Sequence, residues 1–397
     1  MKEAEAVLKR KGVDYQMLYF TCSSLSKDDR ILYGMVDEGD GNPNIFSYDL
    51  ESGDFKILSD NEEGILRSYV YFSGRWQRGL GKASVSLDSK NNTIYYIQGN
   101  EIRRIRKGKI KRLDFIAPDR VTAFTHVSSD GKILAVPTTD KRALEYDLEK
   151  EGMDADRKPC FSIDERCRSE HLSSYISFYD TQSGSMIKEV RVPDCWITHV
   201  VFSPVDSTYM LFNNEWTTEN PGLRRIWLYD GEAYRALREE GEGRSRNDWV
   251  CHEVWTHDGG FVVYHGTRKD GPFVGRINPF SGECIEIPLD PSFSSYGHFT
   301  VDGNGDLICD GYYHGKGEDD GGKGRYISLV HPDWEGRRLL WSPLAYHGSD
   351  WSSQDAHPHP VADHGGRYVY FTSRVDGNLG IYRVSYRLHF CCQHYQS

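Results

Sequence analysis

The sequence lacks a long apolar run, a cysteine framework and an excess of positive charge. No hydrophobic stretch approaches the roughly 20 residues that span a bilayer, and residues 1–16 lack the apolar core of a signal peptide. The nine cysteines are an odd number without CxxC spacing, which is typical of a reduced chain. The formal net charge of −11 disfavours nucleic acid as a partner. We therefore expect a cytoplasmic protein with neither a membrane nor a nucleic-acid partner.

The composition and a sequence repeat both indicate an all-β protein. Aromatic residues make up 13% of the 397 residues and there are 39 glycines, a composition that favours strands and turns. A polar turn followed by an apolar strand recurs seven times. The strands read ILYGMV, TIYYIQ, ILAVP, TYMLF, FVVYHG, DLICDG and YVYFTS. Seven units at intervals of roughly 45 to 60 residues fit the blades of a β-propeller, whereas a large sandwich gives no reason for the repeat.

We therefore predict one seven-bladed β-propeller of four-stranded antiparallel blades that spans residues 1–397. The charged stretch 149–173 interrupts the third unit and is expected to be a surface insertion. The ring has to be closed by pairing of strands near the two chain ends. The tail 385–397 and the N-terminal segment are alternative sources of the closing strand.

One short stretch, SQDAHPHP, contains an amide and two imidazoles: Gln354, His357 and His359. In an extended segment alternate side chains share a face, so the two histidines can point the same way. Neutral imidazoles and an amide oxygen suit a divalent ion such as Mn²⁺ or Zn²⁺. A loop that is rich in histidine without a ligand role is the alternative interpretation.

The other histidines strengthen the interpretation of this stretch as a metal site. A histidine precedes the polar turn in five units, at His126, His199, His252, His298 and His357. Equivalent positions in successive blades form a ring around one mouth of the central channel. Such histidines can simply cap inner strands, which is the simpler expectation for the first two. A site made of His298, Gln354, His357 and His359 needs only two adjacent blades.

Four segments of the sequence resemble the oligogalacturonate lyases, a family of seven-bladed propellers. SQDAHPHP is similar to the family's metal-binding Gln and two His, and YGHFTVDGNGDLICDG to the segment with the remaining ligand histidine. RRIWLYDG and CHEVWTHDG resemble its R-[IM]-W and HE-x-W-x-x-DG segments. The resemblance implies that Mn²⁺ is bound by His298, Gln354, His357 and His359, with Arg225 and His252 at the chemical centre.

One departure concerns the turn after the fourth unit's first strand. Where the family usually carries His-Glu-Gly, this chain reads Asn213-Asn214-Glu215-Trp216. A substrate contact is therefore expected to differ here. Related propeller lyases cleave other uronate-containing glycans, so another uronate glycan is an alternative substrate to the oligogalacturonides of pectin degradation.

The implied reaction is β-elimination at a uronate. A base removes the proton on carbon 5, and the glycosidic oxygen on carbon 4 leaves. An arginine has a pKa above 12, so using Arg225 as the base costs about 7 kcal/mol near neutral pH. A histidine near pKa 6.5 costs almost nothing. We therefore predict His252 as the base and Arg225 as the group that binds the carboxylate or stabilises developing charge, while Arg225 remains the alternative base.

Further substrate contacts are expected from Arg75, Trp76 and Arg78 in the segment SGRWQRG, and from Glu215 and His199. Cations beside an aromatic ring suit a sugar acid, although a solvated loop has the same composition. A non-catalytic propeller, such as a TolB-like binding module, is the alternative from another class. Glycoside hydrolysis is disfavoured because no carboxylate pair is marked by its local context.

Overall fold

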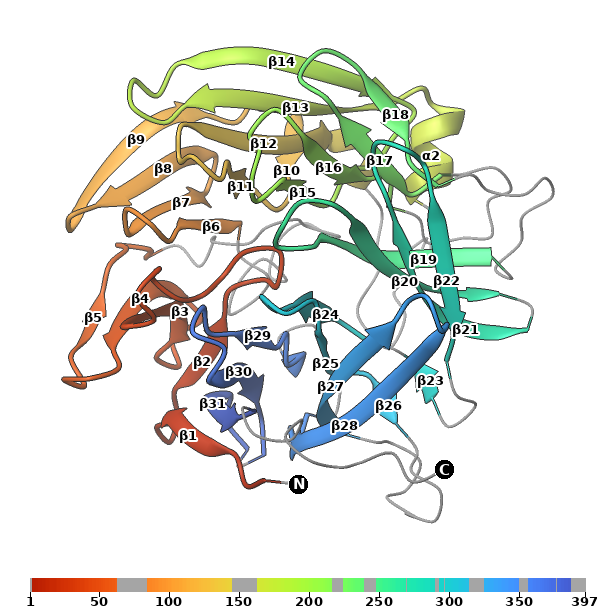
Figure 1. Cartoon of the computed structure of the whole chain (residues 1–397). Helices are drawn as coiled ribbons and strands as arrows, with labels where there is room; N and C mark the ends of the chain where they lie inside the picture. The colour runs from red at the N-terminus through yellow and green to blue at the C-terminus, as the bar shows by residue number, and fades with distance from the viewer. Residues whose placement is uncertain are drawn as a thin grey trace, which may run out of the picture.

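The computed structural model describes residues 2–62, 84–144, 163–215, 224–238, 248–268, 270–289, 293–295, 297–313, 325–349, 356–375 and 377–386. Seven antiparallel sheets surround a central axis as the blades of a β-propeller (Figure 1). The predicted fold is therefore confirmed. Within the described ranges, six blades have four strands, and the third has five because its inner strand is split in two.

The strands of the first four blades follow one another in chain order from the axis outwards. Blade 1 contains β2 (Asp14–Met17), β3 (Ile31–Asp37), β4 (Asn44–Asp49) and β5 (Phe55–Ile57). Blade 2 contains β6 (Val85–Asp88), β7 (Thr93–Gln98), β8 (Glu101–Arg106) and β9 (Lys109–Phe115). Blade 3 contains β10 (Arg120–Thr122), β11 (His126–Val127), β12 (Ile133–Asp140), β13 (Ser173–Asp180) and β14 (Met186–Pro193). Blade 4 contains β15 (Val200–Phe202), β16 (Met210–Asn213), β17 (Ile226–Tyr229) and β18 (Tyr234–Ala236).

The remaining three blades complete the ring. Blade 5 contains β19 (Asp248–Trp255), β20 (Val262–Arg268), β21 (Gly271–Ile277) and β22 (Cys284–Pro288). Blade 6 contains β24 (Phe299–Val301), β25 (Leu307–Cys309), β27 (Tyr326–Asp333) and β28 (Arg338–Tyr346). Blade 7 contains β29 (Val361–Ala362), β30 (Tyr368–Ser373), β31 (Gly380–Ser385) and β1 (Glu5–Leu8). A separate pair is formed by β23 (Phe293–Ser295) and β26 (Tyr312–Tyr313).

The N-terminal strand supplies the outermost strand of blade 7, so the ring is closed by pairing of β1 with β31. Glu5 lies opposite Arg383, whose Nε and Nη2 donate to its carboxylate oxygens at 2.9 and 3.0 Å. Of the predicted tail 385–397, Ser385 ends β31, and residues 387–397 lie outside the described ranges.

The seven apolar strands expected from the repeat lie at the second position of each blade, as β3, β7, β12, β16, β20, β25 and β30. The polar turn before each of them joins it to the inner strand. In blade 3, Asp130 Oδ1 accepts hydrogen bonds from Ser128 Oγ at 2.7 Å and from the Lys132 amide at 3.1 Å. Such an aspartate fixes a tight turn by replacing backbone partners. The histidines that precede these turns therefore lie within the inner strands or shortly before them.

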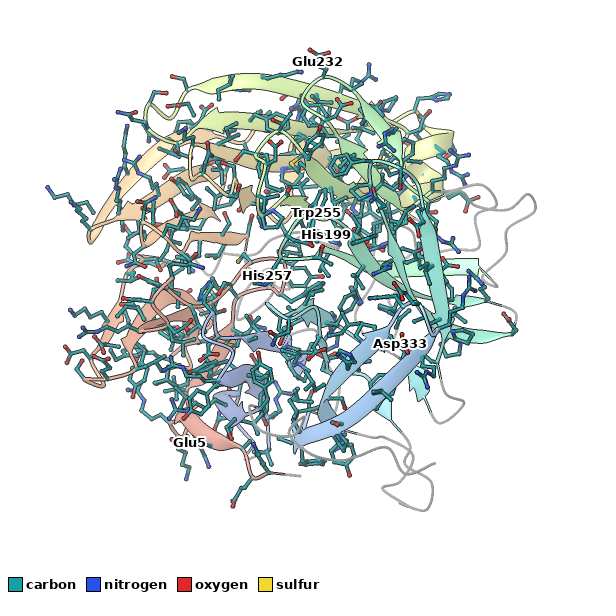
Figure 2. All side chains as sticks on the ribbon, viewed as in Figure 1. Glu5, His199, Glu232, Trp255, His257 and Asp333 are labelled. Atoms are coloured by element: carbon teal, nitrogen blue, oxygen red, sulfur yellow. The ribbon has the colours of Figure 1, made fainter. Side chains whose placement is uncertain are left out.

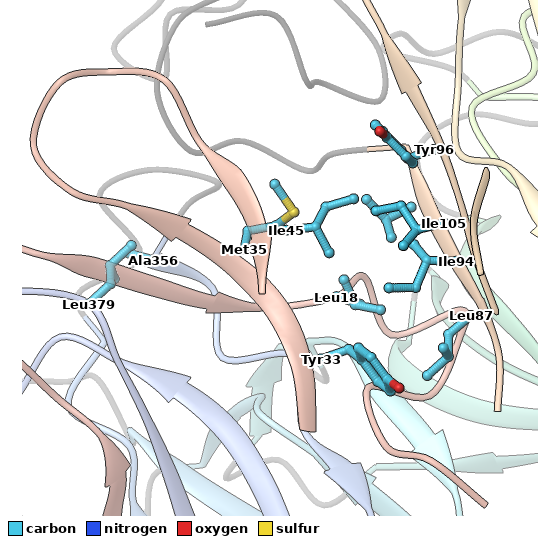
Figure 3. Close-up of a cluster of buried hydrophobic side chains, with 11 residues drawn as sticks. Leu18, Tyr33, Met35, Ile45, Leu87, Ile94, Tyr96, Ile105, Ala356 and Leu379 are labelled. Atoms are coloured by element: carbon cyan, nitrogen blue, oxygen red, sulfur yellow. The ribbon is translucent and has the colours of Figure 1, made fainter. Parts of the chain in front are cut away.

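The core consists of apolar layers between neighbouring blades. Between blades 1 and 2, Met35 and Ile45 face Ile94 and Ile105, and all four are buried (Figure 3). Each such side chain stabilises the fold by about 1.5–3 kcal/mol through burial. These layers hold the blades side by side and fix the inner strands around the axis.

The described end of the expected insertion is helical and packed. The helix α2 (Ile163–Ser169) and the 3₁₀ helix η2 (Lys141–Leu144) share a buried cluster with Trp196. Residues 145–162 of this region lie outside the described ranges. Neither helix within those ranges has the length and apolar character that crossing a bilayer requires.

Candidate active site and metal centre

Three of the predicted ligand histidines converge at the axis. One ring nitrogen each of His298, His357 and His359 lies within 4.8 Å of the other two. The ring centroids of His298 and His359 are 4.1 Å apart, and those of His298 and His357 are 5.0 Å apart. His359 is fully buried and His298 is buried, whereas His357 is half-buried. We call these three residues the metal cluster, because three neutral imidazoles at this spacing can hold a divalent ion.

A buried carboxylate holds two members of the metal cluster in place. Asp310, directly after β25, accepts hydrogen bonds from the His298 amide at 2.7 Å and the His359 amide at 3.1 Å. Its Oδ2 also lies 3.2 Å from His298 Nδ1. The Asp310 carboxylate fits here only because residue 297 is glycine: a Cβ added at Gly297 would lie 2.5 Å from Asp310 Oδ1. A carboxylate behind a ligand histidine fixes the ring's orientation and raises its basicity toward a metal.

The predicted base, His252, lies beside the metal cluster on β19. Its ring centroid is 4.5 Å from that of His298. Its Nδ1 lies 2.8 Å from His265 Nε2 and 3.1 Å from the Gly297 carbonyl oxygen. Burial, followed by the neighbouring imidazoles, holds the pKa of His252 well below its ordinary value. The ring is therefore neutral and has a lone pair available for a proton.

Two of the converging histidines adopt a backbone conformation that is uncommon outside glycine. The φ angles are 53° at His252 and 46° at His359. The register of β19 against β20 shifts between Cys251 and Val254, which marks a bulge at His252. Left-handed residues of this kind recur where a side chain must be aimed at a functional site.

The second predicted catalytic residue, Arg225, belongs to a buried charged cluster. Its Nη1 donates to Glu215 Oε1 at 2.6 Å and its Nε donates to Glu253 Oε2 at 3.1 Å. Its Nη2 lies 3.4 Å from His199 Nε2, and His199 Nδ1 lies 3.5 Å from Glu253 Oε1. We call these four residues the arginine cluster. They bring together three predicted site residues, Arg225, Glu215 and His199.

The charges of the arginine cluster keep Arg225 protonated. Burial disfavours its charge, but Cys251, Glu215 and Glu253 together outweigh that effect and raise the pKa of Arg225 well above its ordinary value. A guanidinium held in its charged form has no lone pair for a proton, and the role predicted for Arg225 remains a prediction. Its planar fork is already engaged by two carboxylates, which the sequence did not indicate.

Several predicted site residues lie outside the described ranges, namely Gln354, Arg75, Trp76 and Arg78. Their predicted roles remain predictions. His126 is a structural contact, because its Nε2 lies 3.0 Å from the Thr21 carbonyl oxygen and its Nδ1 accepts from the Phe202 amide at 3.4 Å.

An aromatic pair after β2 was missed at the level of sequence. The Phe20 ring packs against His252, His298 and His359, with centroids 5.4 to 5.8 Å apart. The Tyr19 ring lies 5.2 Å from His359 and 6.2 Å from His199. The segment thus touches rings from four other blades. Figure 2 shows His199 near the middle of the propeller. Only the aromatic pair itself, YF after an apolar strand, could have pointed to this role.

A cavity of about 640 Å³ borders Phe20. It is lined by the polar turns of the blades, including Lys27, Ser129, His257 and His364. None of the residues of the metal cluster lines it. The chemistry-bearing side chains of the metal cluster therefore lie outside this cavity.

Two curated proteins match about half of the chain in sequence. No family model matches the chain. It is 28% identical over 205 residues to an oligogalacturonide lyase from Pectobacterium atrosepticum, and 25% identical over 205 residues to an oligogalacturonate lyase from Dickeya dadantii. Each match covers 47% of this chain and 49% of the relative. The chain thus spans about half the length of the curated relatives it matches.

Solved structures resemble the chain over nearly its whole length. An oligogalacturonate lyase in complex with manganese matches with a TM-score of 0.70 and 18% identity, covering 94% of this chain and 90% of that one. An oligogalacturonate lyase from Vibrio parahaemolyticus matches with a TM-score of 0.71 and 17% identity, covering 95% and 92%. At these identities the structural likeness shows the fold. The sequence matches and the solved structures thus show what the chain is similar to, namely proteins named oligogalacturonide or oligogalacturonate lyase.

Proposed function

We propose that this protein is an oligogalacturonate lyase that cleaves short oligogalacturonides by metal-assisted β-elimination. The observation that carries the proposal is the convergence of His298, His357 and His359 beside the neutral His252. The names of the sequence relatives support the substrate class, and the manganese complex of a structural relative supports Mn²⁺ as the ion.

The residues present fit such an ion. Three imidazole nitrogens converge, and Asp310 backs two of their residues. We assign Gln354 as the fourth ligand on the sequence resemblance. Neutral ligands leave the full positive charge available, so a bound ion would offset the charge of the substrate carboxylate and make the carbon-5 proton easier to remove.

We assign His252 the role of the base. Its Nδ1 faces the Gly297 carbonyl oxygen, which can only accept a hydrogen bond. With the proton on Nδ1, the lone pair on Nε2 is the one that takes the proton from carbon 5. Neutrality at working pH costs this residue nothing, because its pKa already lies well below the ordinary value.

We assign Arg225 a supporting charge rather than a proton-transfer role. Its carboxylate partners differ in access: the side chain of Glu215 is 22% exposed and that of Glu253 is fully buried. A sugar acid that approaches from the exposed side meets Glu215 first. The substrate carboxylate would replace Glu215 as the hydrogen-bond partner of Arg225 Nη1. Glu253 would keep its hydrogen bond to Arg225 Nε and so hold the guanidinium in place.

The experiment is incubation of the purified protein with digalacturonate and Mn²⁺ while the ultraviolet absorbance of the unsaturated uronate is followed. We expect absorbance to rise with Mn²⁺ and not with a chelator present. A panel of uronate oligomers, including glucuronate linked to rhamnose, tests the sugar. Flat traces with every member of the panel would remove the proposed function and leave a binding module.

A further inference from the structure

A second group of metal-ligating side chains lies on blade 5, next to the metal cluster. Cys251 and His252 are successive residues of β19, and His265 lies opposite Cys251 on β20. The Cys251 Sγ and one ring nitrogen each of His252 and His265 lie within 4.8 Å of one another. Cys251 and His265 are buried and His252 is half-buried. This group is distinct from the three histidines assigned to Mn²⁺.

The backbone explains why two successive side chains meet in one group. In a regular strand they would point to opposite faces of the sheet. The bulge between Cys251 and Val254, with φ of 53° at His252, breaks this alternation. His265 then completes the group from the neighbouring strand. The convergence is therefore a product of the local fold rather than of a flexible loop.

The donor set differs in chemistry from that of the metal cluster. A thiolate with two imidazoles favours thiophilic ions such as Zn²⁺ and Cd²⁺, whereas Mn²⁺ prefers harder donors. The thiol has to release its proton to solvent when an ion binds. The soft sulfur donor therefore discriminates against Mn²⁺.

We propose that Cys251, His252 and His265 form a second metal site, which takes a thiophilic divalent ion such as Zn²⁺ or Cd²⁺. The Nδ1 of His252 and Nε2 of His265 lie 2.8 Å apart. Two nitrogens bound to one tetrahedral Zn²⁺ lie about 3.3 Å apart, so the rings have to separate by about half an ångström. An ion bound at Nδ1 would displace the proton from that atom, to Nε2 or to solvent, and would withdraw electron density from the ring of His252. If the proposed function holds, occupation of this site therefore inhibits the lyase.

The test is a titration of metal-free protein with Co²⁺, which gives a thiolate-to-metal charge-transfer band only when sulfur is a ligand. We expect the band in the unchanged protein and in His357→Ala, which disrupts the metal cluster alone. We expect no band in Cys251→Ser. The matched control is Cys22→Ser, which should keep the band. Cys22 is a thiol outside the proposed site, and its Sγ lies 3.6 Å from the Val85 carbonyl oxygen.

A missing band in the unchanged protein, or a band that persists in Cys251→Ser, would overturn the proposal. If Cys251→Ser does not fold, His265→Gln tests the same site while keeping the thiol, and its affinity for Co²⁺ should fall by about tenfold or more. Unchanged affinity in that variant would also overturn it. Inhibition by Cd²⁺ is a separate readout. The spectroscopic result stands without any lyase activity, so failure of the proposed function is distinguishable from failure of this site.

Discussion

The metal cluster and the arginine cluster are both buried at the centre of the propeller, yet they differ in how their charges are balanced. Arg225 is paired with two glutamates inside the protein. The metal cluster consists of imidazoles, and the carboxylate of Asp310 lies behind them as a hydrogen-bond partner. A fixed internal cation needs its own buried acids, whereas a site for an external cation presents neutral donors. The difference supports the proposed roles, in which the metal cluster binds an ion and the arginine cluster holds a fixed positive charge.

The largest expected effect concerns His252, which lies beside the metal cluster and precedes Glu253 in the chain. Replacing it in His252→Ala should lower the rate of uronate cleavage by about 10²- to 10⁴-fold, because the general base is lost. Affinity for Mn²⁺ should remain close to that of the unchanged protein, and circular dichroism serves as the folding control. A variant that cleaves at the original rate would show that His252 is not the base.

The arginine cluster should matter more for stability than the metal cluster. Glu253→Gln removes a fully buried carboxylate beside Arg225, and we expect the free energy of unfolding to fall by about 3 kcal/mol. His357→Ala, at a half-buried position, should cost about 1 kcal/mol or less. Urea denaturation of the metal-free proteins measures both. Equal losses in the two variants would contradict the contrast between the clusters.

Acid should destabilise the protein through buried neutral histidines such as His126, whose burial lowers its pKa to about 4. In the unfolded chain the imidazole of His126 takes up a proton near pH 6.5, and in the folded chain only near pH 4. The contribution of His126 to the free energy of unfolding is therefore unchanged above about pH 6.5 and falls as the pH drops from 6.5 to 4. At pH 5 the loss from this residue is about 2 kcal/mol.

Denaturation midpoints above about pH 7 and near pH 5 measure this dependence. His126→Gln should reduce the acid sensitivity, since the substituted side chain does not titrate. An acid dependence that is unchanged in the variant would show that other groups carry it.

The smallest expected effect is on metal affinity through Asp310. Asp310→Asn keeps the size of the side chain but removes its charge behind His298, so affinity for Mn²⁺ should weaken by about tenfold, or about 1.4 kcal/mol. The matched control is Asp306→Asn, which changes a buried carboxylate that pairs with His331 at 2.6 Å instead. Equal affinities for the two variants would remove Asp310 from the positioning role.

The sequence predicted the features that repeat. The polar turns such as Ser128–Lys132 recur with the blade period, so the number of blades and the position of His298 relative to His357 followed from counting. The sequence could not predict contacts that depend on one local distortion. The bulge at His252 carries no glycine or proline to mark it, and it brings His252 into one group with Cys251 and His265, which already lie opposite each other.

Contacts between different blades were equally invisible. Glu253 of blade 5 reaches Arg225 of the neighbouring blade 4, and Phe20 reaches histidines of three blades. A neighbouring-residue pattern contains no signal for such contacts, because they are set by the ring geometry and by side-chain length. The proposed roles of Gln354 and of the segment around Arg75 lie outside the described ranges and stay predictions from the sequence.

The most direct test of the metal cluster is a titration of metal-free protein with Mn²⁺, comparing the unchanged chain with His357→Ala. The convergence of His298, His357 and His359 predicts one tightly bound Mn²⁺ per chain and an affinity at least about tenfold weaker in the variant. Equal binding by both proteins, or no binding by either, would contradict the assignment of these histidines as a metal site.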